Sequence, residues 1–205
     1  GVDPENGDPL WYKDEVDANK NPTGKRVTTN DYDSADYYYI NKSSLPKVYG
    51  GFNTSLSWKG FDLSAIFAYS IGGYIYNRDI TMILHNGSLE GRDWSTEILK
   101  RWTPDNRNTD VPALSTTTNN WNSASTRFLQ NNSYMRLKNL TLSYNLPKQW
   151  ISKLSLSSVQ VYVQGDNLFT IHRNQGLDPE QGITGITYYR YPAMRTISGG
   201  INVSF

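Results

Sequence analysis

The chain has 205 residues, of which 37% are hydrophobic and 19% charged, enough for one ordinary globular domain with a core. Its 20 basic and 19 acidic residues give a net charge of +1, so no overall field would attract nucleic acid or an anionic membrane surface. Cysteine is missing, which excludes disulfides, thiolate metal ligands and cysteine nucleophiles.

Residues 1–46 are rich in Asp, Asn, Tyr and Pro and are predicted to form a long loop that could hold one short strand at "PLWYKD". The opening lacks the basic and apolar regions of a signal peptide, so we expect mature or internal sequence. The stretch "DANKN", 17–21, spaces oxygen ligands as calcium loops do. Pro22 and Thr28 stand where such a loop needs glycine and glutamate, so ordinary turn chemistry is the favoured interpretation.

Residues 47–77 are predicted to form a hairpin. Apolar residues alternate with polar ones from Phe52 to Trp58, and the alternation resumes from Phe61 to Ile71 after a turn at Lys59 and Gly60. Period-two alternation is typical of a strand with one polar and one apolar face.

Residues 78–132 are predicted to form a second long loop with one helix, "WSTEILKRW". We expect Asp93 to cap this helix, Glu97 to close a capping box, and Thr103 with Pro104 to end it. No other segment is predicted to be helical.

Residues 133–169 are predicted to form a second hairpin. Leu140 and Leu142 share one phase of alternation, while Met135 and Leu137 have the opposite phase, and a bulge near Lys138 and Asn139 would reconcile them. After "PKQWISK" the second strand alternates at Val159, Val161 and Val163.

The chain closes with a third long loop, residues 170–194, and a strand, residues 195–205. In that strand the apolar positions are Ile197, Ile201, Val203 and Phe205. The connections between the five expected strands are short and long in strict alternation. An antiparallel meander would place both short turns at one end of the sheet and both long loops at the other.

The sequence contains few candidates for catalytic or metal-binding residues. His85 and His172 are isolated and are interpreted as surface histidines, so no metal site or histidine-based catalysis is expected. The carboxylate pairs Asp14–Glu15 and Asp178–Glu180 are interpreted as solvated loop charges rather than as glycosidase groups. "GVDPE" near the start returns as "GLDPE" at 176–180, without a longer period that would make a repeat.

Loop aromatics are the candidates for contact with a ligand or partner. Flat rings beside Asn, Asp and Gln suit stacking on sugars, and they serve equally well to fix the packing of a loop or to bind a protein. The candidates are Trp94, Trp102, Trp121, Tyr188, Tyr189 and Tyr191.

No apolar run is long enough for a membrane-spanning helix, and the mean hydropathy is −0.61. Hydropathy does not reveal transmembrane barrels, because lipid-facing and lumen-facing residues alternate along their strands.

Aromatic residues gather at both ends of the expected strands, as in the interfacial girdles of a barrel. At the short-turn end they are Trp58, Phe61, Tyr144, Trp150 and Phe205, and at the long-loop end Tyr49, Tyr74, Tyr76, Tyr134, Phe169 and Tyr191.

Five ordered motifs resemble the C-terminal barrel segment of the SusC/RagA family of TonB-dependent outer-membrane transporters. They are "RWTPDNRNTDVP", "RFLQNNSYMRLKNLTLSYNLPK", "VQVYVQGDNLFT", "GLDPE" and "YPAMRTISGGINVSF". The fold class implied is an all-β antiparallel transmembrane barrel segment with long extracellular loops, one of which holds a short helix. Family members also have an N-terminal plug and a TonB-contacting box, which have no counterpart here.

The resemblance implies uptake of glycans, or of peptides, across a Gram-negative outer membrane of the Bacteroidota type. Its expected partners are the remaining barrel and plug, a SusD-like surface lipoprotein and the TonB complex. The closing strand with Ile201, Val203 and Phe205 would also be recognised by the barrel-assembly machinery and would contact the lipid bilayer. No catalytic residue, cofactor, metal or nucleic acid is expected.

Two alternatives remain from the residues alone. A secreted carbohydrate-binding β-sandwich would share the polar loops and the aromatics. A glycoside hydrolase domain would need two carboxylates that converge in a cleft.

Overall fold

A computed structural model of the chain describes residues 1–85, 87, 89, 91–115, 120–180 and 182–205. The chain divides into two compact units. One comprises Gly1–Asn41 and Asn77–Leu129, and the other Lys42–Tyr76 and Gln130–Phe205. Among the described residues, no helix is both long enough and apolar enough to cross a membrane.

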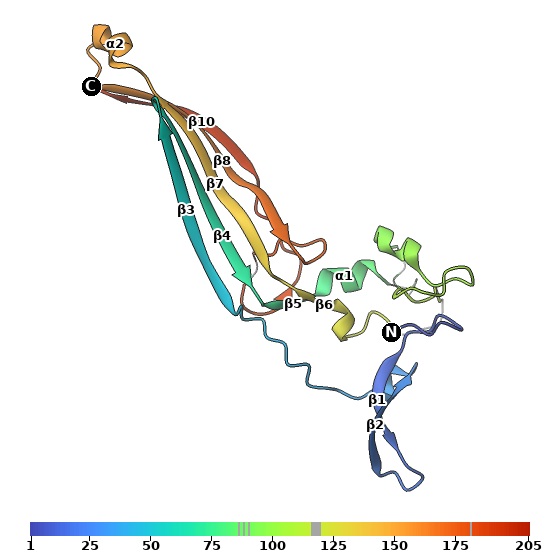
Figure 1. The fold of residues 1–205 in the computed structure, drawn as a ribbon. Helices are drawn as coiled ribbons and strands as arrows, with labels where there is room; N and C mark the ends of the chain where they lie inside the picture. Colours follow the sequence, from blue (N-terminus) through green and yellow to red (C-terminus); the bar gives the residue numbers. More distant parts are fainter. Residues whose placement is uncertain (86, 88, 90, 116–119, 181) are drawn as a thin grey trace. The chain divides into compact units, whose positions relative to one another are not determined.

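The unit that contains the C-terminus is built on an antiparallel sheet, whose strands run side by side in Figure 1. Each of the five strands expected from alternation is present, so this part of the fold prediction is confirmed. In spatial order they are β10 (Thr196–Ser204), β8 (Ser158–His172), β7 (Tyr134–Asn145), β4 (Phe61–Ile71) and β3 (Val48–Trp58).

Connections at the two ends of the sheet differ in length, as expected. Lys59 and Gly60 join β3 to β4, and both have positive φ angles, 48° and 87°, which suits the twist of a two-residue hairpin turn. The β7–β8 connection holds only the short helix α2 (Lys148–Ile151) and a 3-10 turn (Ser152–Leu154). These connections and the C-terminus lie at the same end of the sheet in Figure 1.

The predicted bulge in β7 is confirmed at Lys138. Leu137 pairs with Phe67 and Asn139 with the adjacent Ile66, so Lys138 has no partner on β4. On the other side, β8 also breaks register, between its partners for Leu137 and Asn139. The extra residue resets the alternation, so that Leu137 and Leu140 come to lie on the same face of the sheet.

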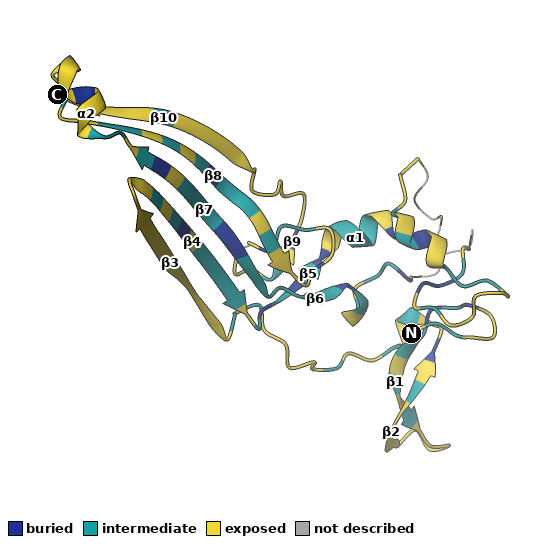
Figure 2. Ribbon diagram, turned by 45° about the horizontal axis from the view of Figure 1, so that its top comes forward, coloured by how far each residue is buried: buried dark blue, intermediate teal, exposed yellow. Residues whose placement is uncertain are grey.

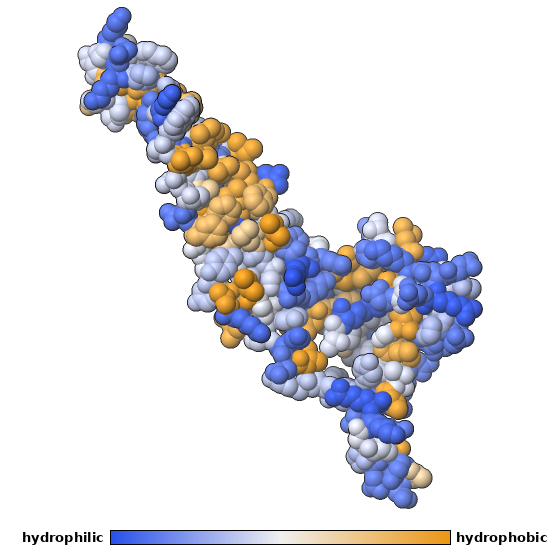
Figure 3. Space-filling view, viewed as in Figure 1, coloured by the Kyte–Doolittle hydropathy of each residue, from blue (hydrophilic) through white to orange (hydrophobic). Residues whose placement is uncertain are grey.

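That face is apolar, and many of its side chains are exposed. Phe52 and Phe67 stack across β3 and β4 with ring centroids 4.7 Å apart, and Phe61 meets Tyr144 at 4.5 Å. Apolar side chains gather over the middle of the sheet in Figure 3. A β-sandwich would bury such a face under a second sheet, whereas many of the side chains on this face are exposed. Exposed members include Leu56, Leu63, Leu142, Val163, Ile197, Ile201 and Val203.

Both outer strands of the sheet are exposed. β3 is exposed at every residue and β10 at all but one, as the yellow strands in Figure 2 show. Each pairs with one neighbour within the described chain, and its other edge carries unpaired backbone N–H and C=O groups.

Three short strands form a smaller sheet in the order β6 (Leu129–Asn131), β5 (Tyr74–Asn77) and β9 (Ile186–Thr187).

The unit that contains the N-terminus begins with a hairpin of β1 (Trp11–Val16) and β2 (Pro22–Thr29). The first strand matches the expected short strand, whereas the second was not predicted because it lacks alternation. Asp17 Oδ1 accepts hydrogen bonds from the amides of Asn19 and Asn21, at 2.8 and 2.9 Å. The stretch considered as a calcium loop is therefore a hydrogen-bonded turn.

The helix prediction in this unit was partly wrong. The segment forms only a 3-10 helix, Thr96–Lys100, and its cap is Ser95, whose side chain accepts from the Glu97 amide. Glu97 pairs with Lys100 instead of closing a capping box. A second helix, α1 (Arg78–Ile83), was missed, although Asn77 caps it by accepting from the Ile80 amide.

Candidate functional site

The face of the main sheet opposite the apolar one carries hydrogen-bonded polar side chains. Asn139 donates to Asp166 at 2.7 Å across β7 and β8, and Asn145 donates to Asp62 at 2.7 Å across β7 and β4. Gln160 bridges Ser143 on one side and Asn202 on the other. The network links all five strands, because Asp62 also accepts from Ser57 of β3. Such a face suits contact with water, in contrast to its apolar counterpart.

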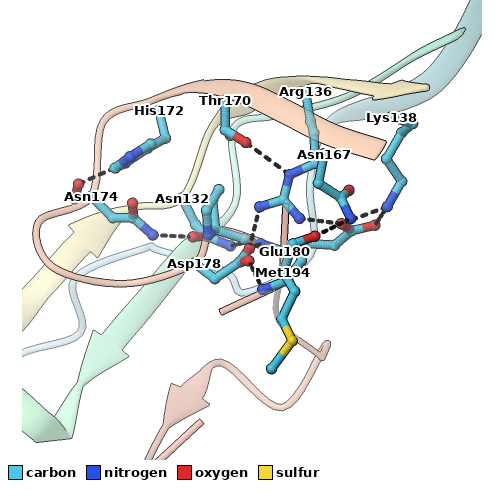
Figure 4. Close-up of polar contacts among 12 residues, drawn as sticks. Asn132, Arg136, Lys138, Asn167, Thr170, His172, Asn174, Asp178, Glu180 and Met194 are labelled. Atoms are coloured by element: carbon cyan, nitrogen blue, oxygen red, sulfur yellow. Dashed lines mark hydrogen bonds and ion pairs between the residues drawn. The ribbon is translucent and has the colours of Figure 1, made fainter. Parts of the chain in front are cut away.

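A cluster of charges lies where this polar face meets the β8–β10 connection (Figure 4). Arg136 of β7 is only 3% exposed. Its Nη2 lies 2.5 Å from Asp178 Oδ1, and its Nη1 lies 2.8 Å from Glu180 Oε2. Its Nε donates to Thr170 Oγ1 of β8 at 2.8 Å. All three guanidinium nitrogens are therefore used, which fits the preference of buried arginine for paired, hydrogen-bonded surroundings.

The bulge supplies the second cation of this cluster. Lys138 Nζ lies 2.8 Å from both carboxylate oxygens of Glu180. Arg136 and Lys138 thus hold the same carboxylate from positions two residues apart on β7. Sequence reasoning missed both residues, since within a strand they look only like polar positions.

Asp178 is held tightly within the connection. Its side chain is 6% exposed, and it accepts from the amides of Ala193 at 2.6 Å and Glu180 at 2.9 Å. Burial alone would raise the pKa of this carboxyl, but the two amides and the Arg136 guanidinium outweigh it, so the pKa lies below its ordinary value. The interpretation of Asp178 as a solvated loop charge was therefore wrong, because Arg136 is placed to receive it. Glu180 remains partly exposed while it pairs with Arg136 and Lys138.

Amide side chains fix the rest of the connection. Asn132 Nδ2 donates to the carbonyl of Pro179 at 2.8 Å, and Asn174 Nδ2 donates to Asn132 Oδ1 at 2.8 Å. Asn167 Nδ2 donates to the carbonyl of Met194 at 3.1 Å, near the start of β10. Figure 4 shows these contacts beside the charge cluster. The "GLDPE" stretch is thereby held against the polar side of the sheet.

Three of the six aromatic candidates lie in the same connection and are exposed. Tyr188 and Tyr189 contact each other with ring centroids 4.1 Å apart, and Tyr191 is 93% exposed. Exposed phenol rings of this kind are available to a ligand or a protein partner.

The three tryptophans belong to the other unit and take part in its packing. Trp121 is 2% exposed and forms an apolar cluster with Ile98 and Val111. Trp102 Nε1 donates to the Pro4 carbonyl at 3.1 Å, and its ring lies against Gly7, where an added Cβ would come within 2.6 Å. Of the alternatives considered, the fixing of loop packing describes Trp121 and Trp102 within this chain.

Trp94 is half-exposed and bonds to a histidine. Its Nε1 donates to His85 Nδ1 at 3.1 Å. His85 is 1% exposed, so its interpretation as a surface residue was wrong, and burial lowers its pKa. His172, at the end of β8, is exposed as expected, and its Nδ1 lies 2.9 Å from the Asn174 carbonyl.

The strand assigned to closure of a barrel forms one edge of the sheet. Ile201 and Val203 of β10 are exposed and pair with Val161 and Val159 of β8. Phe205 follows the strand and is exposed. These side chains continue the apolar face, because their partners on β8 belong to it.

Comparisons with known proteins agree on one group of relatives, although no family model matches the chain. TonB-dependent receptor P3 of Formosa agariphila is 35% identical over 166 residues, which cover 76% of this chain and 16% of the receptor. TonB-dependent receptor SusC of Bacteroides thetaiotaomicron is 29% identical over 98% of this chain and 18% of its own length.

Among solved structures, the RagAB peptide transporter contains a chain that matches all of this one with a TM-score of 0.83 and 36% identity. The match covers 22% of that chain. The RagAB peptide importer in its "open-open" state gives a TM-score of 0.82. The present chain thus spans about a fifth of the length of the proteins it matches, which are named as receptors and transporters.

Proposed function

Because the chain belongs to the SusC/RagA family of TonB-dependent receptors, we propose that it forms part of the barrel wall of an outer-membrane importer. In this proposal the apolar face of the β3–β10 sheet contacts lipid and the polar face lines the lumen. The contrast between the two faces is the observation that carries it. β3 and β4 have 11 residues each, and a tilted strand needs about 9–11 residues to cross a bilayer.

The open edges of β3 and β10 support assembly with further strands of the same protein. Unpaired backbone groups are not tolerated in hydrocarbon, so strands outside this chain must pair with both edges. Large outer-membrane transporters solve this with barrels of about 22 strands and a plugged lumen. Recognition of β10 and Phe205 by the barrel-assembly machinery is part of the same proposal.

We propose that the long connections face the cell exterior. There the exposed Tyr188, Tyr189 and Tyr191 would contact the ligand or a SusD-like lipoprotein that closes the importer from outside. The similarity of the whole chain to part of the RagAB peptide transporter supports such a partner here. Energy would come from TonB acting on the plug of the full-length receptor. In this proposal the protein is a transporter of a Bacteroidota-type outer membrane and not an enzyme.

The proposed cargo is an oligosaccharide or a peptide. A cavity of about 310 Å³ lies at the long-connection end of the sheet, and its lining includes Tyr49, Tyr74, Tyr134 and Asn132. Tyr49 and Tyr134 both pair with Ser70, so they flank it on neighbouring strands. Aromatic rings beside hydroxyl and amide groups suit the faces and edges of sugars and equally the side chains of a peptide.

The lipid-facing assignment is tested with two substitutions in the full-length receptor, Phe67→Arg and Ile66→Arg. These neighbours on β4 are both apolar but lie on opposite faces. An arginine facing lipid near the bilayer midplane costs about 2–4 kcal/mol, so Phe67→Arg should lower the amount of receptor in carbonate-washed outer membranes. Ile66→Arg should leave that amount close to wild type. Equal effects of the two variants would contradict the assignment.

The importer assignment is tested by deleting the full-length gene in the native host. Growth on purified oligosaccharides and peptides as sole nutrients should be lost for the cargo class and retained on monosaccharides and amino acids. Unchanged growth on every polymer tested would refute the proposal.

A further inference from the structure

A second cavity, of about 530 Å³, lies between the end of β8 and the β8–β10 connection. Its lining includes three arginines, Arg136, Arg190 and Arg195, together with His172, Phe169 and Asp178. Arg136 and Asp178 are already paired with each other. The charge that this wall presents is therefore set by the two remaining arginines.

Arg190 and Arg195 are the two arginines in question, and both are exposed. Within the described part of the chain, neither has a carboxylate oxygen at ion-pair distance. The carboxylates of the same connection, Asp178 and Glu180, are engaged by Arg136 and Lys138. Both carboxylates are thus paired with cations of the sheet, whereas the guanidinium groups of Arg190 and Arg195 are exposed and line the cavity.

We propose that this cavity binds a carboxylate group of the imported ligand through Arg190 and Arg195. The planar guanidinium presents paired N–H donors that match the two oxygens of a carboxylate. The inference rests on the proposed importer function and narrows its cargo to molecules that carry such a group, whether as a uronic acid or as a peptide terminus.

The backbone between the two arginines is held at two points, one of them by the charge cluster. The amide of Ala193 donates to Asp178, and the carbonyl of Met194 accepts from Asn167. These two residues lie between Arg190 and Arg195 in sequence. A fixed backbone lowers the entropy lost when the two side chains close on a ligand, so the buried pair contributes to affinity without touching the ligand.

The test uses the purified full-length receptor and calorimetric titration with four probes. Two are oligosaccharides of equal length, one of galacturonic acid and one neutral, and two are copies of one peptide, with a free or an amidated C-terminus. The variants are Arg190→Gln, Arg195→Gln and their combination. Arg173→Gln is the matched control, because Arg173 is an exposed arginine of the same connection that does not line the cavity.

We expect each single variant to weaken binding of at least one carboxylate-bearing probe about tenfold, and the double variant more, as for charged hydrogen bonds. Neutral probes and the control should change less than twofold. The inference is overturned if wild type binds no carboxylate-bearing probe, or if charged and neutral probes lose affinity equally. If the full-length receptor still imports neutral cargo, either result overturns only this inference and not the importer assignment. If the receptor imports no cargo class at all, the importer assignment itself is contradicted.

Discussion

Replacement of Arg136 by methionine should release the β8–β10 connection from the sheet. Methionine keeps most of the aliphatic volume of the side chain. It lacks the guanidinium, so the ion pairs with Asp178 and Glu180 and the hydrogen bond to Thr170 are lost. Removing one partner of a buried ion pair costs about 3–5 kcal/mol. Asp178 retains two amide donors and Glu180 retains Lys138, so we expect the lower end, about 3 kcal/mol. That corresponds to an opening of the connection roughly 150-fold more frequent.

Hydrogen exchange measured by mass spectrometry on the full-length receptor reports this opening directly. Peptides from 174–194 should lose protection in Arg136→Met, while peptides from β3 and β4 should not. The double variant Arg136→Met with Asp178→Asn should recover part of the protection, because no unpaired buried charge remains. Unchanged protection in Arg136→Met, or a double variant worse than the sum of its parts, would refute the view that the pair holds the connection.

Three further outcomes are expected. Lys138→Ala should weaken the docking of the connection by only about 0–1 kcal/mol in the same exchange assay, because this ion pair is partly solvated. The lowered pKa of Asp178 means that its contribution is complete above the ordinary carboxyl pKa and is lost as pH falls through the lowered value. A spin label at Thr184→Cys should therefore gain mobility below about pH 4, and Asp178→Asn should abolish that dependence. Trp121→Ala should destabilise the unit that contains the N-terminus by about 3–5 kcal/mol, seen as faster proteolysis within 78–129, and a change confined to ligand affinity would contradict its structural role.

The strands were predictable because their information is local. Alternation and the Lys59–Gly60 turn define β3 and β4 within some 25 residues of sequence, and the conflict of phase between Leu137 and Leu140 is enough to locate the bulge. The helix α1 was missed because a six-residue helix shows less than two turns of periodicity.

The charge cluster could not be predicted from the sequence, for a different reason. Arg136 and Asp178 are 42 residues apart, and their pairing depends on the path of a connection that has no periodic pattern. Burial of Trp121 and His85 is equally a property of tertiary packing, since both lie in a segment whose composition resembles an exposed loop. The "GLDPE" stretch was noticed in sequence, and only the structure shows which cations receive its carboxylates.

The bulge at Lys138 also changes which length variants of this strand can survive. Deleting a residue from a regular strand turns every side chain beyond it to the opposite face, which would exchange the apolar and polar faces of the strand. Deletion of Lys138 instead brings Leu137, Asn139 and Leu140 into plain alternation, already matched to Phe67, Ile66 and Ala65 on β4. A strand with one residue fewer at this point can therefore keep the same apolar and polar faces opposite β4, with loss of the ion pair to Glu180.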